Sequence, residues 1–171
     1  MRVVDPVDGS PRAAGETGMV QIRGPNVFAG YWRNPEKTAA EFTQDGWFVS
    51  GDLGAFDRAG SLAIVGRAKD LVITGGYNVY PKEVEDAIDA LPGVVESAVI
   101  GVPDADLGEA VAAVVVRAAG ADAPDEAEVA ALLARTLARF KRPRRVHFVD
   151  ELPRNAMGKV QKSVLRARFG A

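Results

Sequence analysis

Cysteine is absent from this chain of 171 residues, and His147 is its single histidine. Without a thiol, the chain cannot form disulfides, use thiolate catalysis or hold a cysteine-ligated metal. One imidazole cannot build a histidine-rich metal centre, so we predict no metal site here. The lack of disulfides also fits a reducing compartment.

Long apolar runs and a broad charge of one sign are missing too. No run approaches the ~20 apolar residues that a membrane-spanning helix needs, and the N-terminus lacks the basic and then apolar pattern of a signal peptide. Lys and Arg number 21 and Asp and Glu 23, for a formal net charge of -2. This balance disfavours nucleic acid and anionic lipid as partners. We therefore expect a cytoplasmic protein that acts on small molecules.

Residues 1–66 read as short strands separated by Gly and Asp turns, with one short helix near 34–42. The strands are expected at 19–23, 47–49 and 61–65, as an antiparallel meander. So few strands cannot build a core without another layer to cover them. We expect this part to be an incomplete, β-rich tail of a larger domain, whose exposed strands could self-associate or dock on a partner.

Residues 70–171 predict a compact α+β unit. Three apolar runs predict a central, mostly antiparallel three-stranded sheet, flanked by helices that begin at Pro81 and Asp125 and by a last helix that ends at Phe169. Asp125 and Glu128 have the spacing of a capping box, and we expect that helix to run to about Arg142. The strands are expected at 94–102, 110–116 and 146–149.

The stretch from Gly66 to Glu85, GRAKDLVITGGYNVYPKEVE, joins the two parts. Leu71 to Ile73 is a short β-type run, and Gly75-Gly76 can adopt positive φ, which most other residues avoid. We interpret residues 67–69 as a hinge and the glycine pair as a loop that faces a ligand.

Several polar residues have two interpretations each when taken alone. Lys159 lies in a turn-rich loop, where it could be catalytic or could be solvated without a function, as most loop lysines are. Asp52, after a strand, could accept hydrogen bonds from sugar hydroxyls or cap a turn. Arg67 could bind a phosphate or ribose, or could pair with Asp70. His147 falls in a predicted strand, where a structural role is the commoner one.

Taken together, four stretches resemble the C-terminal part of the adenylate-forming (AMP-binding) enzymes, which include acyl-CoA synthetases, luciferases and peptide-synthetase adenylation domains. The stretches cover nearly the whole chain. The wording GPNVFAGYW, ITGGYNVYPKEVE and LPRNAMGKVQK is most similar to malonyl-CoA synthetases and neighbouring acyl-CoA ligases. The four stretches are 15–32, 47–52, 66–85 and 153–162.

The resemblance implies a two-step ligase with ATP and coenzyme A as co-substrates. A carboxylate attacks the α-phosphate of ATP to give an acyl adenylate and pyrophosphate, and the thiol of coenzyme A then displaces AMP. By matching position, Asp52 and Arg67 would bind the ribose of the nucleotide. Lys159 would neutralise charge at the carboxylate and the α-phosphate during the first step.

The resemblance also implies a rotation between the two steps. Lys69 occupies the hinge position, and rotation there would remove Lys159 and bring Gly75, Gly76 and Tyr77 toward the pantetheine thiol. Gly76 would fit a narrow tunnel because it has no side chain.

The chain departs from the family at its front. The phosphate-binding loop, the adenine-binding segment and the acyl pocket are missing, so we expect Mg²⁺ to be bound mainly by the missing domain and the isolated chain to be inactive. The alternative is a non-catalytic interaction module or separate subunit that docks an adenylation half. Lys159 could also be a site of regulatory acylation, which would remove its charge.

Overall fold

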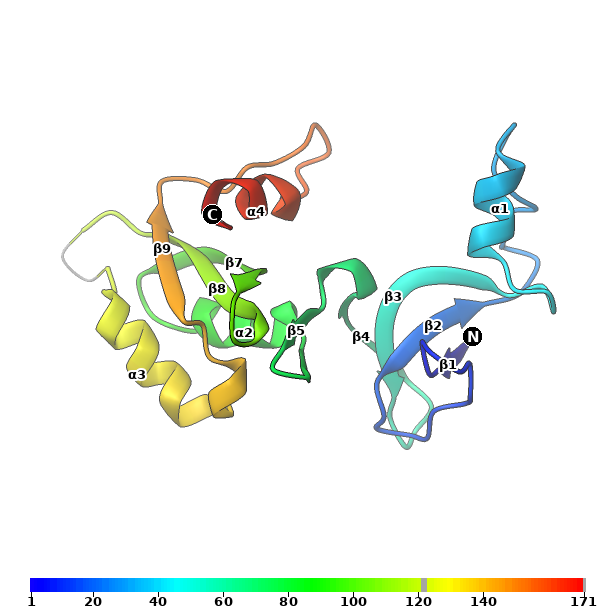
Figure 1. Cartoon of the computed structure of the whole chain (residues 1–171), viewed down its shortest axis with the longest axis horizontal. Helices are drawn as coiled ribbons and strands as arrows, with labels where there is room; N and C mark the ends of the chain where they lie inside the picture. Colours follow the sequence, from blue (N-terminus) through cyan, green and yellow to red (C-terminus); the bar gives the residue numbers. More distant parts are fainter. Residues whose placement is uncertain (121–122, 171) are drawn as a thin grey trace. The chain divides into compact units, whose positions relative to one another are not determined.

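The computed structural model describes residues 1–120 and 123–170. It divides into two compact units, Met1–Lys69 (unit 1) and Asp70–Ala171 (unit 2). Figure 1 shows the elements of each unit, which we describe separately. The division falls at the end of the segment that the sequence predicts to be a hinge, and the hinge itself stays a prediction.

Unit 1 is a four-stranded antiparallel sheet in the order β1-β2-β3-β4, which confirms the expected meander. Its core is small, with Val3, Val4, Val20 and Leu53 buried. The strand β1 was not predicted because three residues carry too little alternation to be recognised. The elements are β1 (Arg2–Val4), β2 (Gly18–Ile22), α1 (Pro35–Glu41), β3 (Phe48–Phe56) and β4 (Leu62–Arg67).

The helix α1 begins where its sequence predicts. The Asn34 side chain accepts a hydrogen bond from the Lys37 N–H at 3.0 Å, and Pro35 occupies the first turn, where its missing N–H costs nothing. The helix buries none of its residues within unit 1.

Unit 2 holds a five-stranded sheet in the order β6-β5-β8-β7, with β9 parallel to β8. The α+β class and the mostly antiparallel sheet are confirmed, but the sheet has five strands instead of three. The two extra strands, β5 and β6, form a tight hairpin of three residues each. The first overlaps the predicted β-type run at 71–73, which was not expected to join the sheet, and the second follows the predicted glycine loop. The strands are β5 (Val72–Thr74), β6 (Tyr77–Val79), β7 (Val94–Asp104), β8 (Gly108–Arg117) and β9 (Arg145–Val149).

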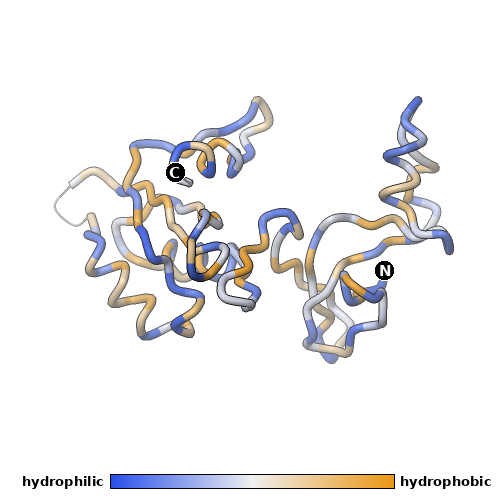
Figure 2. Tube along the Cα trace, viewed as in Figure 1, coloured by the Kyte–Doolittle hydropathy of each residue, from blue (hydrophilic) through white to orange (hydrophobic). Residues whose placement is uncertain are grey.

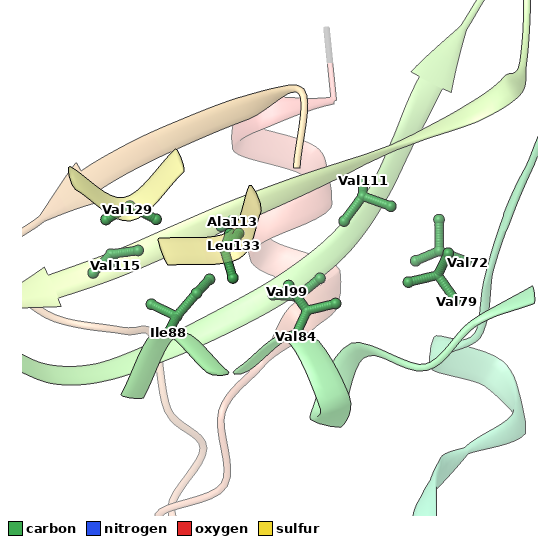
Figure 3. Close-up of a cluster of buried hydrophobic side chains, with 10 residues drawn as sticks. All are labelled: Val72, Val79, Val84, Ile88, Val99, Val111, Ala113, Val115, Val129 and Leu133. Carbon is green, nitrogen blue, oxygen red and sulfur yellow. The ribbon is translucent and has the colours of Figure 1, made fainter. Parts of the chain in front are cut away.

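Helices cover both faces of this sheet. On one face, alternate residues of β7 and β8 such as Val99 and Ala113 pack against α2 (Pro81–Asp89) and α3 (Glu126–Thr136), as Figure 3 shows. On the other, Ile100 and Val114 pack in a cluster with Leu165 of α4 (Lys162–Phe169). Because both faces are buried, the middle of β7 and most of β8 are hydrophobic (Figure 2).

The helix α3 carries the predicted capping box but ends earlier than expected. The Asp125 side chain accepts from the Glu128 N–H at 2.8 Å, and the Asp125 N–H donates to Glu128 at 3.0 Å. The helix stops at Thr136, and Leu137 is extended. The chain then needs residues 137–144, including the 3₁₀ turn η2 (Arg139–Lys141), to return to the start of β9, so the helix cannot continue to Arg142.

His147 lies in β9 and stacks on Phe169 of α4, with the ring centroids 4.4 Å apart. Burial, and then the nearby Arg145 cation, lowers the pKa of His147 below its usual 6.5. The unfolded chain therefore binds a proton more readily than the folded one near this pH, so stability is lost as the pH falls below about 6.5.

We expect the free energy of unfolding of unit 2 to decrease between pH 7 and pH 5, measured by urea titrations read from NMR signals of β8. His147→Phe preserves the stacking and should flatten this slope. His147 is the only histidine, so a slope that persists in the variant would assign the effect to another group.

Candidate functional site

Lys159 projects from a tight turn whose backbone is well satisfied. The Asn155 side-chain oxygen accepts from the N–H groups of Met157 and Lys159, each at 3.0 Å. The Asn155 N–H donates to the Lys159 carbonyl at 3.0 Å, and Gly158, at φ +76°, closes the turn by donating to the Asn155 carbonyl at 2.9 Å. Residues 155–159 are exposed, so a fixed turn presents the lysine to solvent.

The segments on both sides of this turn are anchored in unit 2. Before it, Leu152 is buried in the cluster beneath α4, and Arg154 forms an ion pair with Glu96 of β7. After it, Lys162 forms an ion pair with Glu85 of α2 at 2.6 Å, largely buried. The turn is therefore held from two different elements. Neither ion pair was predicted from the sequence, because Arg154 and Glu96 lie 58 residues apart and Lys162 and Glu85 lie 77 residues apart.

The two residues predicted to bind ribose come together in unit 1. Asp52 of β3 and Arg67 of β4 face each other across the strands, and Arg67 Nη1 donates to Asp52 Oδ1 at 2.6 Å. The side chains keep exposed fractions of 30% and 51%, so both can still meet a ligand. The alternative partner for Arg67, Asp70, instead accepts from Arg166 of α4 at 2.8 Å.

Lys69 is the exposed residue of η1 (Ala68–Asp70), a single 3₁₀ turn between β4 and β5. Short 3₁₀ segments are common connectors, and their bonds are weaker than those of an α-helix. Such a segment is compatible with a hinge.

Gly75 and Gly76 form the two-residue turn between β5 and β6, with φ of +55° and +83°. Positive φ at both central residues matches the type I′ hairpin turn, which favours glycine. A β-carbon on Gly75 would lie 3.2 Å from the Leu107 side chain. Tyr77, which follows the turn, is exposed and stacks on Phe140 of η2 with centroids 4.7 Å apart.

A hollow of about 810 Å³ lies beside this glycine turn, and three arginines line it. Arg142 donates to the carbonyls of Leu137 and Ala134 at 3.0 Å each and so caps the end of α3. Arg144 pairs with Asp104 at 2.8 Å. Among the described residues, Arg139 has no hydrogen-bond or ion-pair partner for its side chain. The basic run Arg139–Arg145 was visible in the sequence, but only the fold brings it to the glycine turn.

Hydrogen bonds, first from the Leu107 N–H, lower the pKa of Asp104, with a smaller effect of Arg144. Asp104 therefore stays ionised at neutral pH and holds Arg144 at the rim of the hollow.

The Lys159 turn and the glycine turn are attached to opposite ends of the β7–β8 hairpin. Glu96, which anchors the Lys159 turn, pairs with Val116, whereas Thr74 beside the glycine turn pairs with Gly108. These two points on β8 are eight residues apart, or roughly 27 Å at ~3.4 Å per residue. The two turns therefore cannot serve one reacting centre at the same time, and each would need a different orientation of unit 2 to reach it.

Comparison with known proteins decides the family of this unit. Residues 83–159, which contain Glu85, Glu96 and Lys159, match the family of the AMP-binding enzyme C-terminal domain. The chain carries an AMP-binding C-terminal domain. The resemblance seen in the sequence is thereby confirmed, and the AMP-binding C-terminal domain includes most of unit 2.

Relatives of the AMP-binding C-terminal domain extend this match into unit 1. The chain is 53% identical over 151 residues to a 3-[(3aS,4S,7aS)-7a-methyl-1,5-dioxo-octahydro-1H-inden-4-yl]propanoyl:CoA ligase of Mycobacterium tuberculosis, covering 88% of the chain and 30% of that ligase. It is 48% identical over 162 residues to a feruloyl-CoA synthase of an Amycolatopsis species, covering 95% of the chain and 33% of the synthase.

A solved structure, ATP-bound MatB from Rhodopseudomonas palustris, matches 99% of the chain with a TM-score of 0.94 and 61% identity, over 33% of its own chain. The chain thus spans about a third of the length of the proteins it matches. The two ligases are named for different acids, so similarity to them does not identify which carboxylic acid a protein with this domain uses.

No helix among the described residues is long and apolar enough to cross a membrane.

Proposed function

We propose that this chain is the C-terminal third of an ATP-dependent acyl-CoA synthetase, which converts a carboxylate, ATP and coenzyme A into acyl-CoA, AMP and pyrophosphate through an acyl adenylate. The observation that carries the proposal is the fixed turn of the AMP-binding C-terminal domain, which presents Lys159 to solvent from two anchors. A lysine held in this way can meet a reacting centre at a defined place, as electrostatic catalysis requires.

In the first step, the carboxylate oxygen attacks the α-phosphorus and pyrophosphate leaves. Negative charge gathers on the oxygens of both reactants, and the Lys159 ammonium stabilises it. Asp52 accepts hydrogen bonds from the ribose hydroxyls, and Arg67 keeps the Asp52 carboxylate oriented through its 2.6 Å hydrogen bond. These roles are the ones that the family resemblance implies for the same positions.

In the second step, the thiol of coenzyme A attacks the acyl carbon and AMP leaves. Rotation at Lys69 would replace Lys159 by the glycine turn, in line with the attachment of the two turns to opposite ends of β7–β8. Gly75 and Gly76 leave room for the pantetheine arm, and the hollow beside Tyr77 supplies cations for the phosphates of coenzyme A.

Mg²⁺ accompanies ATP in such reactions. Within residues 1–120 and 123–170, no group of three or more acidic or histidine side chains could hold it. Mg²⁺ beside ATP needs only one or two carboxylates in addition to the phosphates. In line with the family resemblance, we propose that it is bound mainly by the other two thirds of the enzyme.

The proposal also names a carboxylic acid substrate. We propose malonate as the first acid to test, because three stretches of the chain resemble malonyl-CoA synthetases and the chain is 61% identical to MatB. Ferulate is the comparison, since a relative is named for it.

A chimera tests the proposal, with this chain replacing the equivalent third of Rhodopseudomonas palustris MatB. We expect the chimera to form acyl adenylate and acyl-CoA, and the chain alone to form neither.

An interaction module is the second candidate, favoured by Trp32, which is 86% exposed beside a hollow of about 820 Å³ in unit 1. Such a module would restore neither half-reaction in the chimera.

Arg139 gives a test of coenzyme A binding. Arg139 lines the hollow beside Tyr77, and a hydrogen bond to a charged group contributes ~1.5–3 kcal/mol. We expect Arg139→Ala to weaken coenzyme A binding by about tenfold in calorimetry on the chimera, since 1.4 kcal/mol is tenfold. Arg135→Ala, an exposed arginine of α3, is the control. Equal affinities in the two variants would remove Arg139 from the site.

A further inference from the structure

Arg154 joins the Lys159 turn to the sheet through one guanidinium group. Its Nη1 donates to the carbonyl oxygen of Gly158 at 2.6 Å, and its Nη2 pairs with the Glu96 carboxylate. Gly158 is the residue immediately before Lys159. The guanidinium therefore connects the backbone next to the lysine to the strand β7.

The hydrogen bond to Gly158 supplies what the internal bonds of the turn cannot. The bonds of Asn155 with Met157, Gly158 and Lys159 fix the shape of the turn, but they say nothing of its direction relative to the sheet. The Arg154 fork adds an external reference, because it is planar and can serve both partners at once. A lysine ammonium at this position would lack the planar fork and would hold the two partners less firmly.

We propose that Arg154 is a positioning residue, which sets the direction of the Lys159 turn by linking the Gly158 carbonyl to Glu96. The proposal rests on the adenylation role proposed for Lys159. Arg154 would not touch the substrate, and its effect would come from where the Lys159 ammonium lies. Misplacement of a catalytic group by about 1 Å can cost up to ~10²-fold in rate.

Charge reversal separates this role from a general contribution to stability. The double variant Arg154→Glu/Glu96→Arg can restore an ion pair between the turn and β7. A glutamate at 154 has no hydrogen to donate to the Gly158 carbonyl, so the link to the turn stays broken. A stabilising ion pair would be rescued by the reversal, whereas positioning would not.

The first experiment uses the whole chain and needs no catalysis. NMR order parameters of the amides of 155–159 are expected near 0.85 in the unmodified chain and below about 0.6 in Arg154→Ala and in the reversed pair, with the rest of unit 2 unchanged. Arg154→Lys should fall between these values, and Arg135→Ala, an exposed arginine outside both sites, should match the unmodified chain. A turn that remains rigid in Arg154→Ala would overturn the proposal.

The second experiment uses the MatB chimera and its two half-reactions. Arg154→Ala and the reversed pair should lower kcat of adenylation by about tenfold or more. They should leave KM for ATP and the thioester step within about twofold. Rescue of adenylation by the reversed pair, or equal loss of both half-reactions, would contradict positioning. If Arg154→Ala does not fold, Glu96→Ala provides the same comparison, because it removes the β7 end of the link.

The two experiments also separate this proposal from the proposed function. An inactive unmodified chimera would count against the proposed function, while the order parameters of the turn would still decide whether Arg154 directs it.

Discussion

Lys159→Ala in the MatB chimera is expected to lower the rate of acyl-adenylate formation by about 10²–10³-fold. The substitution removes the cation that we propose stabilises charge in the transition state, and loss of one such electrostatic contact costs about this factor. Lys159 is exposed on a turn held by the Asn155 side chain and backbone, so truncation should leave the turn intact. Pyrophosphate release with ATP and malonate measures this step.

The thioester step provides the decisive comparison for Lys159. When pre-formed acyl adenylate and coenzyme A are supplied, Lys159→Ala should keep a rate within a few-fold of the unmodified chimera, because the proposed rotation replaces the lysine by the glycine turn in that step. Lys82→Ala is the matched control, since Lys82 is an exposed lysine of α2 paired with Asp86. A loss of both steps in equal measure would rule out alternating roles for the two turns.

Glu85→Leu is expected to destabilise unit 2 by about 3 kcal/mol, the low end of the cost of leaving one partner of a buried ion pair unpaired. The Glu85 and Lys162 side chains are only 12% and 19% exposed. Glu85 also accepts the Val99 N–H at 2.8 Å, a group of β7 that no strand on its outer edge satisfies. For a unit of about this size, the loss corresponds to roughly 12–24 °C in melting midpoint.

Two variants sharpen this experiment. Glu83→Leu lies on the same helix and breaks the more exposed pair with Lys141, so it should cost less than about 1 kcal/mol. Glu85→Leu/Lys162→Met removes both charges and should recover much of the loss. Urea titrations read by NMR give the free energy of unfolding of unit 2 in each variant. If Glu85→Leu were no worse than Glu83→Leu, the buried pair would not be what holds the start of α4 in place.

The ion pairs Glu85–Lys162 and Glu96–Arg154 also connect the stability of unit 2 with the candidate site. Lys162 begins α4 three residues after Lys159, so the contact that stabilises the helix also ends the loop that carries the lysine. Arg154 holds the other side of that loop. The fold therefore ties the Lys159 turn to α2 and β7 by contacts that substitution can separate one at a time.

Much of unit 2 was predictable from local patterns. Asp125 and Glu128 mark a helix start wherever they occur at that spacing, and the apolar runs of β7 and β8 mark strands buried on both faces. The pair Gly75-Gly76 predicts a tight turn, because two successive residues with positive φ are rarely anything but glycine. Each of these signals acts over a few neighbouring residues, so a single sequence contains it in full.

Local patterns in the sequence specify most strands and helices of both units, the turn that carries Lys159, and the resemblance to adenylate-forming enzymes. They miss β1 and β6 and place the end of α3 too late. Packing selects Asp52 as the partner of Arg67, although Asp70 is nearer in the sequence. It also adds β5 and β6 to the sheet. Finally, it brings Arg154 to Glu96 and Lys162 to Glu85, so that the turn is anchored on both sides. The physical reason is distance along the chain. A charged side chain has many possible partners in the sequence, and only packing selects the one that comes within reach.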